Sequence, residues 1–190
     1  AKVIHTKTVK PAVEKNIPVK ILNTMNPGSP GTTILGTSTK SARTIKAISL
    51  KKNISVINIC SSRMFGPYGF LAQIFTVFAK HKVPVDVVAT TEVSVSITVE
   101  DGSFNPTLVQ DLAMFATVKV VPNQIIVSVV GEGMKNDYTV EQKLFDTLAK
   151  AKIPTELISK GASQINLTFI VSAKDAEQCA RALHKTFFGK

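Results

Sequence analysis

The feature of this sequence that most constrains its fold is an internal repeat with a constant offset of 70 residues. The run KHKVP at residues 80–84 returns as KAKIP at residues 150–154. Phe75 returns as Phe145 and Thr98 as Thr168, and the offset does not slip over about 45 residues. A constant offset over that length indicates a duplicated supersecondary unit rather than two chance similarities.

The first copy of the repeat predicts the element order βαββαβ. Val95, Ile97 and Val99 alternate with small polar residues, the pattern of a half-buried strand. Phe70, Ile74 and other apolar residues fall at helical spacing before Pro84. We expect strands at residues 54–60, 85–89, 93–99 and 117–121, and helices at residues 68–82 and 106–115. This order describes a ferredoxin-like sandwich with both helices on one face of an antiparallel sheet.

The second copy lacks a closing strand. We expect a strand at residues 125–130, a helix at 139–151, strands at 153–159 and 164–171, and a final helix from residue 173. A spare apolar strand lies before the first copy at residues 44–50 (TIKAISL). We predict that it completes the second sheet and covers its bare edge, so that the first copy is inserted within the second.

The composition excludes several classes of protein. No apolar run reaches the roughly 20 residues that a bilayer needs, so we expect no membrane association. Two cysteines and three scattered histidines give no metal-binding spacing. Cys60 and Cys179 lie on apolar-patterned elements, and we expect both to be core thiols. No glycine-rich phosphate loop follows a strand.

The net charge of +10 raises the possibility of a nucleic-acid partner. A ferredoxin-like sheet binds RNA through exposed aromatic residues on its central strands. Small polar residues such as Asn58, Ser96 and Thr98 alternate there instead, and the lysines are scattered along the chain. We therefore expect a solvated basic surface and no nucleic-acid partner, and we keep a basic nucleic-acid-binding protein as the minor alternative.

The most informative local feature is the start of the helix near residue 69. The backbone N–H groups of Gly69, Phe70, Leu71 and Ala72 would be the unpaired donors of that helix and form an anion site suited to a carboxylate. Asp86 follows in an apolar strand, and Glu92 follows at the next turn. Together these groups complement a small zwitterion that carries an extra amine. That Asp86 only caps or pairs locally is an equally good interpretation.

Residues 69–99 (GFLAQIFTVFAKHKVPVDVVATTEVSVSITV) resemble the first ACT domain of aspartate kinases. Thr91 stands where that family usually has serine. Residues 1–34 resemble the end of the family's kinase domain, and residues 161–188 resemble its second ACT domain and last helix. The run SSRMFGPYGFLA at residues 61–72 resembles the lysine-sensitive, plant-like monofunctional branch.

The resemblance implies an α+β fold with two ferredoxin-like ACT domains, the first inserted within the second, preceded by a remnant of the α/β kinase domain. The implied domains are the kinase end (1–36), a linker and the completing strand (37–53), the first ACT domain (54–122) and the second ACT domain (123–190). The parent enzyme would phosphorylate aspartate with ATP and magnesium. The family's catalytic motifs are absent here, so we expect no catalytic residues and no cofactor in this chain.

The resemblance also implies a feedback site for an amino-acid effector, most favourably lysine, where the first ACT domains of two subunits meet in a homodimer. The residues carried over are Ser62, Met64, Gly69, Phe70, Leu71, Ala72, Val85, Asp86, Thr90, Thr91 and Glu92. Threonine or S-adenosylmethionine is the alternative effector, because the same groups serve any amino acid. The expected location is the cytoplasm, or the plastid of a photosynthetic eukaryote.

Overall fold

The computed structural model describes residues 4–36, 44–61 and 68–189, and the chain divides into two compact units, Ala1–Ala42 and Arg43–Lys190. The predicted linker at 37–43 and the site residues Ser62 and Met64 lie outside the described residues. No helix among the described residues is both long and apolar enough to cross a membrane.

The first unit contains one helix and one small sheet. Helix α1 (Thr6–Glu14) begins after His5, whose side chain accepts a hydrogen bond from the backbone N–H of Lys7. Strands β1 (Val19–Ile21) and β2 (Thr32–Ile34) pair antiparallel. Val9 of α1 is buried, and Pro18 directly precedes β1.

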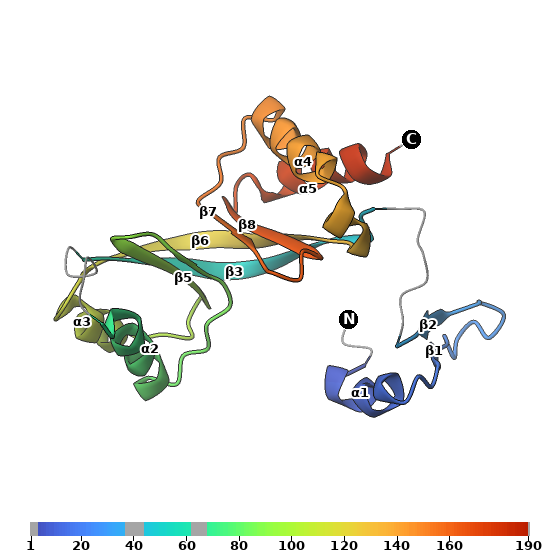
Figure 1. The fold of residues 1–190 in the computed structure, drawn as a ribbon, viewed down its shortest axis with the longest axis horizontal. Coiled ribbons are helices and arrows are strands. Elements are labelled where there is room, and N and C mark those ends of the chain that lie inside the picture. The colour runs from blue at the N-terminus through green and yellow to red at the C-terminus, as the bar shows by residue number, and fades with distance from the viewer. Residues whose placement is uncertain (1–3, 37–43, 62–67, 190) are drawn as a thin grey trace. The chain divides into compact units, whose positions relative to one another are not determined.

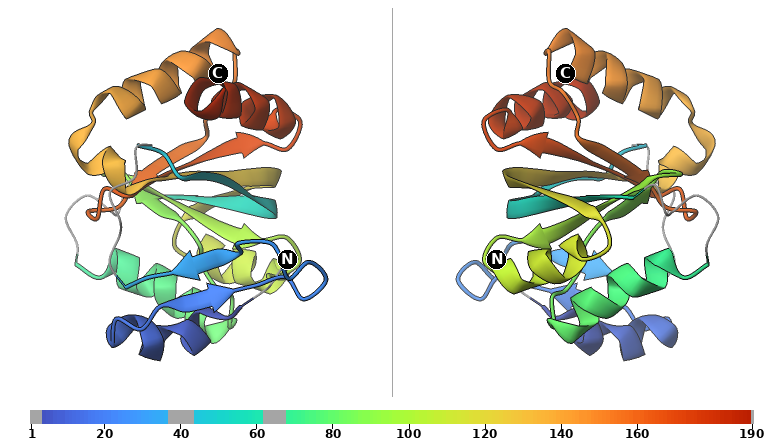
Figure 2. Two further views of the ribbon diagram at one scale, coloured as in Figure 1. Left: turned by 90° about the vertical axis from the view of Figure 1, so that its right-hand side faces the viewer. Right: turned by 90° about the vertical axis from the view of Figure 1, so that its left-hand side faces the viewer.

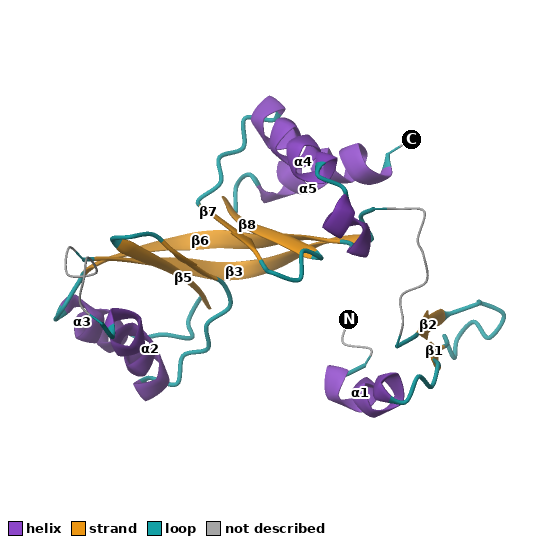
Figure 3. Cartoon of the chain, in the orientation of Figure 1, coloured by secondary structure: helices purple, strands orange, loops and turns teal. Residues whose placement is uncertain are grey.

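The second unit is built on one six-stranded antiparallel sheet with the strand order β4-β5-β3-β6-β8-β7 (Figure 1). Its helices and strands, coloured by type in Figure 3, are β3 (Ala47–Cys60), α2 (Phe70–Lys80), β4 (Val88–Thr90), β5 (Ser94–Glu100), α3 (Pro106–Ala113), β6 (Thr117–Val130), the 3₁₀ turn η2 (Glu132–Asn136), α4 (Thr139–Lys150), β7 (Leu157–Lys160), β8 (Asn166–Ser172) and α5 (Ala176–Phe188).

Two long strands, β3 and β6, are each shared by both copies of the repeat. Residues 54–60 of β3 pair with β5 and with the first half of β6. Residues 47–51 of β3 pair instead with the second half of β6, next to β8. The early part of β3 therefore completes the strands of the second repeat, which confirms that the first repeat is inserted within the second. The exact domain boundaries stay a prediction.

The sequence predicts separate strands where the structure has one continuous strand in each of β3 and β6. The pairing of β3 with β6 shifts register between Lys51 and Ile54. Asn53 and Asn123, 70 residues apart, adopt the left-handed conformation with φ of 59° and 58°. Asparagine enters this region at less cost than other non-glycine residues, so the chain bends there without ending the strand.

Each repeat buries its own helix pair against one face of the sheet. In the first repeat, Ile74, Phe78 and Leu112 of α2 and α3 pack on the β3 and β5 residues Ile57 and Ile97. The second repeat buries the equivalent faces of α4 and α5. Figures 1 and 2 show that the α2–α3 pair and the α4–α5 pair cover opposite faces of the continuous sheet.

The faces of the two repeats that point away from their helices meet in a third apolar cluster. Its buried members are Ile54, Val56, Ile126, Leu157 and Ile170. Strands β4 and β7, at the two ends of the strand order, approach each other beside this cluster. Each repeat therefore depends on the other to keep its second face out of water.

Beside the third cluster, the polar positions of the strands expected to be half-buried are themselves covered. Thr98 is fully buried and Thr168 is nearly so. The Thr98 hydroxyl accepts a hydrogen bond of 2.8 Å from the backbone N–H of Val87, which satisfies the buried oxygen. Alternation along the strands showed which residues share a face, but the approach of the second repeat buries that face.

Candidate functional site

The start of α2 presents unpaired backbone donors. Gly69 precedes the helix with φ of 90°, a left-handed conformation that glycine adopts at little cost. Within the described part of the chain, nothing accepts a hydrogen bond from the backbone N–H of Phe70, Leu71 or Ala72. The buried Phe70 ring packs edge-on against the Phe115 ring, with 5.9 Å between the ring centroids. Leu71 and Ala72 are exposed. The helix start is therefore anchored by one ring and open to an anion.

Thr90, Thr91 and Glu92 form the turn from β4 into β5, and all three are exposed. The backbone N–H of Thr91 donates to the Ser94 carbonyl at 2.8 Å, and the Thr91 hydroxyl accepts from the Ser94 N–H at 3.1 Å. Threonine at this position therefore stabilises the turn with the same hydroxyl that serine would supply. Glu92 is left at the tip of the turn.

The turn and the start of α2 lie at the same end of the first repeat. The backbone N–H of Ser61, which follows β3, donates to the carbonyl of Val93 in the turn at 3.0 Å. The Ser61 hydroxyl also approaches the carbonyl of Phe115, at 3.5 Å. Since the Phe115 ring contacts Phe70, Ser61 contacts both the turn and a residue that packs on the helix start.

Val85 and Asp86 lie farther down the sheet, before β4. The Asp86 N–H donates to the carbonyl of Thr98 at 3.0 Å, whereas Thr91 bonds to Ser94. These partners are four residues apart on β5, or about 13 Å at the usual rise of a strand. One chain therefore places the helix start and the Thr90–Glu92 turn at the same end of the repeat, whereas Asp86 pairs about 13 Å farther along β5.

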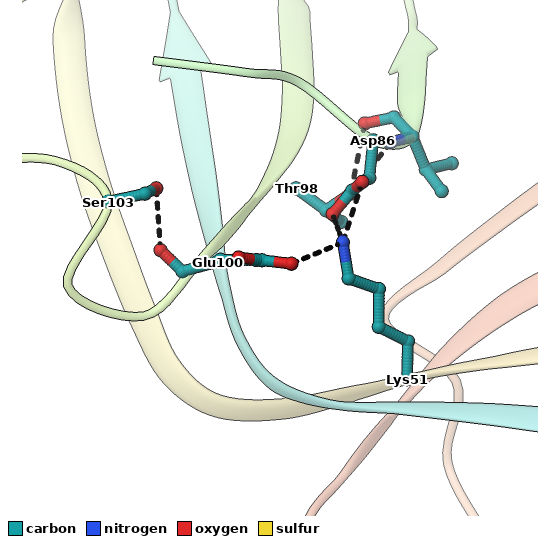
Figure 4. A network of polar contacts seen from close by, with 6 residues as sticks. Lys51, Asp86, Thr98, Glu100 and Ser103 are labelled. Carbon is teal, nitrogen blue, oxygen red and sulfur yellow. Dashed lines mark hydrogen bonds and ion pairs between the residues drawn. The ribbon is translucent and has the colours of Figure 1, made fainter. Parts of the chain in front are cut away.

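The Asp86 carboxylate is engaged by Lys51 of β3. Lys51 Nζ lies 2.8 Å from Oδ1 and 2.7 Å from Oδ2 of Asp86. The same ammonium lies 2.9 Å from Oε1 of Glu100 (Figure 4). Burial acts to lower the pKa of Lys51, but hydrogen bonds to Asp86 and Glu100 outweigh it and raise that pKa above its usual value. Lys51 therefore stays charged at neutral pH.

Asp86 therefore forms an ion pair within its own chain, although its partner is 35 residues away in the sequence. Sequence reasoning missed Lys51 and Glu100 as members of this cluster. The available signal was a lysine pair, Lys51 and Lys52, interrupting two apolar runs. Nothing in the sequence indicated which acidic residues would face it, because Lys51 and Asp86 meet only through the register of the sheet.

Other reactive side chains give no alternative centre within the described residues. No group of three or more histidine, cysteine or acidic residues there could hold a metal ion. Cys60 is exposed, so the expectation that both cysteines are core thiols is wrong for Cys60. Cys60 is the last residue of β3 and, by the alternation of the strand, lies on the face of the sheet opposite α2 and α3. Cys179 is buried on α5, and burial raises its pKa to about 11.

Comparisons with known proteins agree with this architecture. The ACT domain family model matches residues 127–187, which is the second repeat. Aspartokinase 2, chloroplastic, of Arabidopsis thaliana is 38% identical over 199 residues, covering 99% of this chain and 36% of the relative. The fold and this match define a regulatory protein with tandem ACT domains.

Two solved structures narrow the identification. A C-terminal regulatory domain assigned to aspartate kinase from Porphyromonas gingivalis W83 is 32% identical with a TM-score of 0.66, covering 76% of this chain and 99% of that one. Escherichia coli aspartokinase III, in complex with lysine and aspartate, has a TM-score of 0.84 at 30% identity, covering 98% of this chain and 42% of that one. The chain belongs to the aspartate kinase family, as a regulatory portion. It spans about a third of the length of the Arabidopsis relative.

Proposed function

We propose that this chain binds an end-product amino acid, most favourably lysine, between the first ACT domains of two copies and thereby transmits feedback inhibition. The observation that carries the proposal is the set of unpaired N–H groups of Phe70, Leu71 and Ala72 beside the acidic turn at Glu92. The N–H groups suit the carboxylate of an amino acid, and Glu92 suits an ammonium group by a charge-assisted hydrogen bond.

The separation of Asp86 from the helix start supports a site between two copies. An effector held between two copies would contact the helix start of one copy and Asp86 of the other. Binding across such an interface couples ligand occupancy to the geometry of the two subunits, which lets a small ligand bias a larger assembly.

The exposed face of α2 supports the same arrangement. Leu71 and Phe75, four residues apart on that face, are 42% and 39% exposed. Tyr68, just before the helix, is fully exposed. An apolar stripe of this kind beside the candidate site is a surface that a second copy would cover on dimerisation.

Lysine is favoured over other effectors because the candidate residues offer two acidic side chains. The related E. coli aspartokinase III has been solved with lysine and aspartate bound. Threonine and S-adenosylmethionine remain the alternatives, since the helix start recognises the carboxylate that they share with lysine.

We further propose that the parent protein phosphorylates the β-carboxylate of L-aspartate with ATP and magnesium, giving 4-phospho-L-aspartate, in the cytoplasm or a plastid. The Arabidopsis relatives carry the description chloroplastic. This chain would supply regulation and not catalysis. Incubation with aspartate, ATP and magnesium should give no ADP from this chain alone, whereas the longer protein should release ADP and lysine should suppress it.

Calorimetric titration of this 190-residue chain with lysine tests the effector site, with sedimentation reporting its oligomeric state. We expect saturable lysine binding by a dimer and its loss in Glu92→Ala, with Glu132→Ala on η2 as the matched control. If a folded dimer does not bind lysine but binds threonine or S-adenosylmethionine, that amino acid is the effector of the site. A folded dimer that binds none of the three would refute the site.

A further inference from the structure

Lys51 places a primary ammonium group, carried on a flexible aliphatic stem, against two acidic side chains of the first repeat. Both carboxylate oxygens of Asp86 and one of Glu100 lie within 2.9 Å of its Nζ. The three side chains are partly exposed, at 42% for Lys51, 30% for Asp86 and 58% for Glu100. The cluster is therefore an accessible ammonium-binding site, filled by a residue of the same chain (Figure 4).

The backbone holds the two acids in place. The Asp86 N–H donates to the Thr98 carbonyl at 3.0 Å, and the Ser103 hydroxyl donates to the Glu100 carbonyl at 2.7 Å. Lys51 comes from the part of β3 that belongs to the second repeat, next to the register shift in the pairing of β3 with β6. Its contact with Asp86 and Glu100 consequently joins the two repeats.

We propose that Lys51 is a tethered competitor of the effector: Asp86 and Glu100 form the seat for the effector's side-chain ammonium, and the effector must displace Lys51 to occupy it. This inference rests on the proposed effector site and adds two residues to it. Glu100 becomes a residue that determines specificity, and Lys51 becomes the residue that sets affinity.

The chemistry of the displacement favours lysine over an uncharged side chain. Free lysine presents the same ammonium group as Lys51, so one charge-assisted contact replaces another. The hydroxyl of threonine brings no charge, and it would leave the Lys51 contact in place. The two acids thus select a cationic side chain among amino acids that bind the helix start equally well.

Competition also predicts a magnitude. A ligand that binds only the fraction of molecules whose site is free has its apparent affinity reduced by that fraction. A partly exposed ion pair of this kind is weak because water competes with it, so Lys51 reduces the fraction of free sites only by a modest factor. Removing the Lys51 charge should therefore tighten lysine binding about two- to fivefold.

The test compares Lys51→Met with Lys52→Met by calorimetric titration of the whole chain. Lys52 is the adjacent exposed lysine, and no described residue forms an ion pair with it. We expect Lys51→Met to bind lysine about two- to fivefold more tightly and Lys52→Met to match the wild type. L-norleucine, which has the lysine stem without its ammonium, should bind both variants and the wild type alike. Lys51→Gln serves as a second variant that keeps a polar side chain.

Several outcomes overturn the inference while leaving the effector site intact. Wild-type binding of lysine with unchanged or weaker affinity in both Lys51 variants would show that Lys51 does not compete. An equal gain for norleucine and lysine would show a change of packing instead of charge. Glu100→Gln should weaken lysine binding without affecting norleucine, and no effect on lysine would remove Glu100 from the seat.

The ion pair can be tested without any effector. Melting temperatures of Lys51→Met, Asp86→Asn and the double variant should be non-additive, because the second substitution removes a contact that is already lost. Additive shifts would show that the pair does not form and would overturn the inference. Non-additive shifts in a chain that binds no lysine would instead locate the failure in the proposed effector site.

Discussion

Replacing Leu144 with alanine is expected to destabilise both repeats, although Leu144 belongs only to the second. Its side chain on α4 is fully buried in the second core. The substitution deletes three carbon atoms, worth about 2.4 kcal/mol at ~0.8 kcal/mol for each buried methylene. The cavity left behind raises the expected loss to about 3–5 kcal/mol.

The loss should spread because the two repeats share structure. Strands β3 and β6 run through both repeats, and the third cluster, with Ile54 from one repeat and Ile170 from the other, needs both. Unfolding the second repeat alone would expose that cluster and the edge of β6. The second unit should consequently unfold as one cooperative body.

Amide hydrogen exchange under increasing urea, resolved by mass spectrometry, measures the opening free energy of each helix separately. In Leu144→Ala, peptides from α2 and α4 should lose the same free energy. Ile158→Ala on β7, where the side chain is 44% exposed, is the control and should cost less than about 1 kcal/mol. Faster exchange confined to α4, α5, β7 and β8 would refute the argument for shared cooperativity.

Two further predictions concern titratable side chains. Hydrogen bonds from Lys80 and then His81 lower the pKa of Asp111 below its usual 3.8, so this carboxylate stabilises the fold above that value and the benefit is lost as the pH falls through the lowered pKa. The difference in urea midpoint between wild type and Asp111→Asn should be constant near neutral pH and shrink below about pH 4; a difference that does not vary with pH would contradict it. Cys60, which is exposed, should be alkylated by iodoacetamide at pH 8 while Cys179, with its pKa of about 11, stays unmodified in the native chain, as peptide mass mapping would show. Equal labelling of both would contradict the burial of Cys179.

The locations of most elements in the second unit could be predicted because their signals are local. The helical spacing of Phe70, Ile74 and Phe78 predicted α2, and the alternation of Val95, Ile97 and Val99 predicted β5. The strands expected at 85–89 and 153–159 begin later, at Val88 and Leu157. Pro84 and Pro154 precede these two strands, and each strand begins a few residues after its proline, which has no backbone N–H to donate.

The candidate site was predictable only in part. The helix start at Gly69 and the acidic residues Asp86 and Glu92 carry recognisable sequence signals. The separation of Asp86 from the Thr90–Glu92 turn was not predictable, because it depends on where along β5 each segment pairs. The Lys51 contact escaped sequence reasoning for the same reason, since it spans 35 residues and is fixed by sheet register.

By itself, the sequence determined the repeat, the periodicity of each helix and strand, and the insertion of one ACT domain within the other, because these follow from the spacing of apolar residues along the chain. Only the tertiary structure decided that β3 and β6 run unbroken through both repeats. It alone also showed that the polar face around Thr98 is buried, and that Lys51 occupies the acids of the candidate site. Each of these depends on which distant segments meet, and a residue's own sequence neighbourhood does not specify its partners across a sheet.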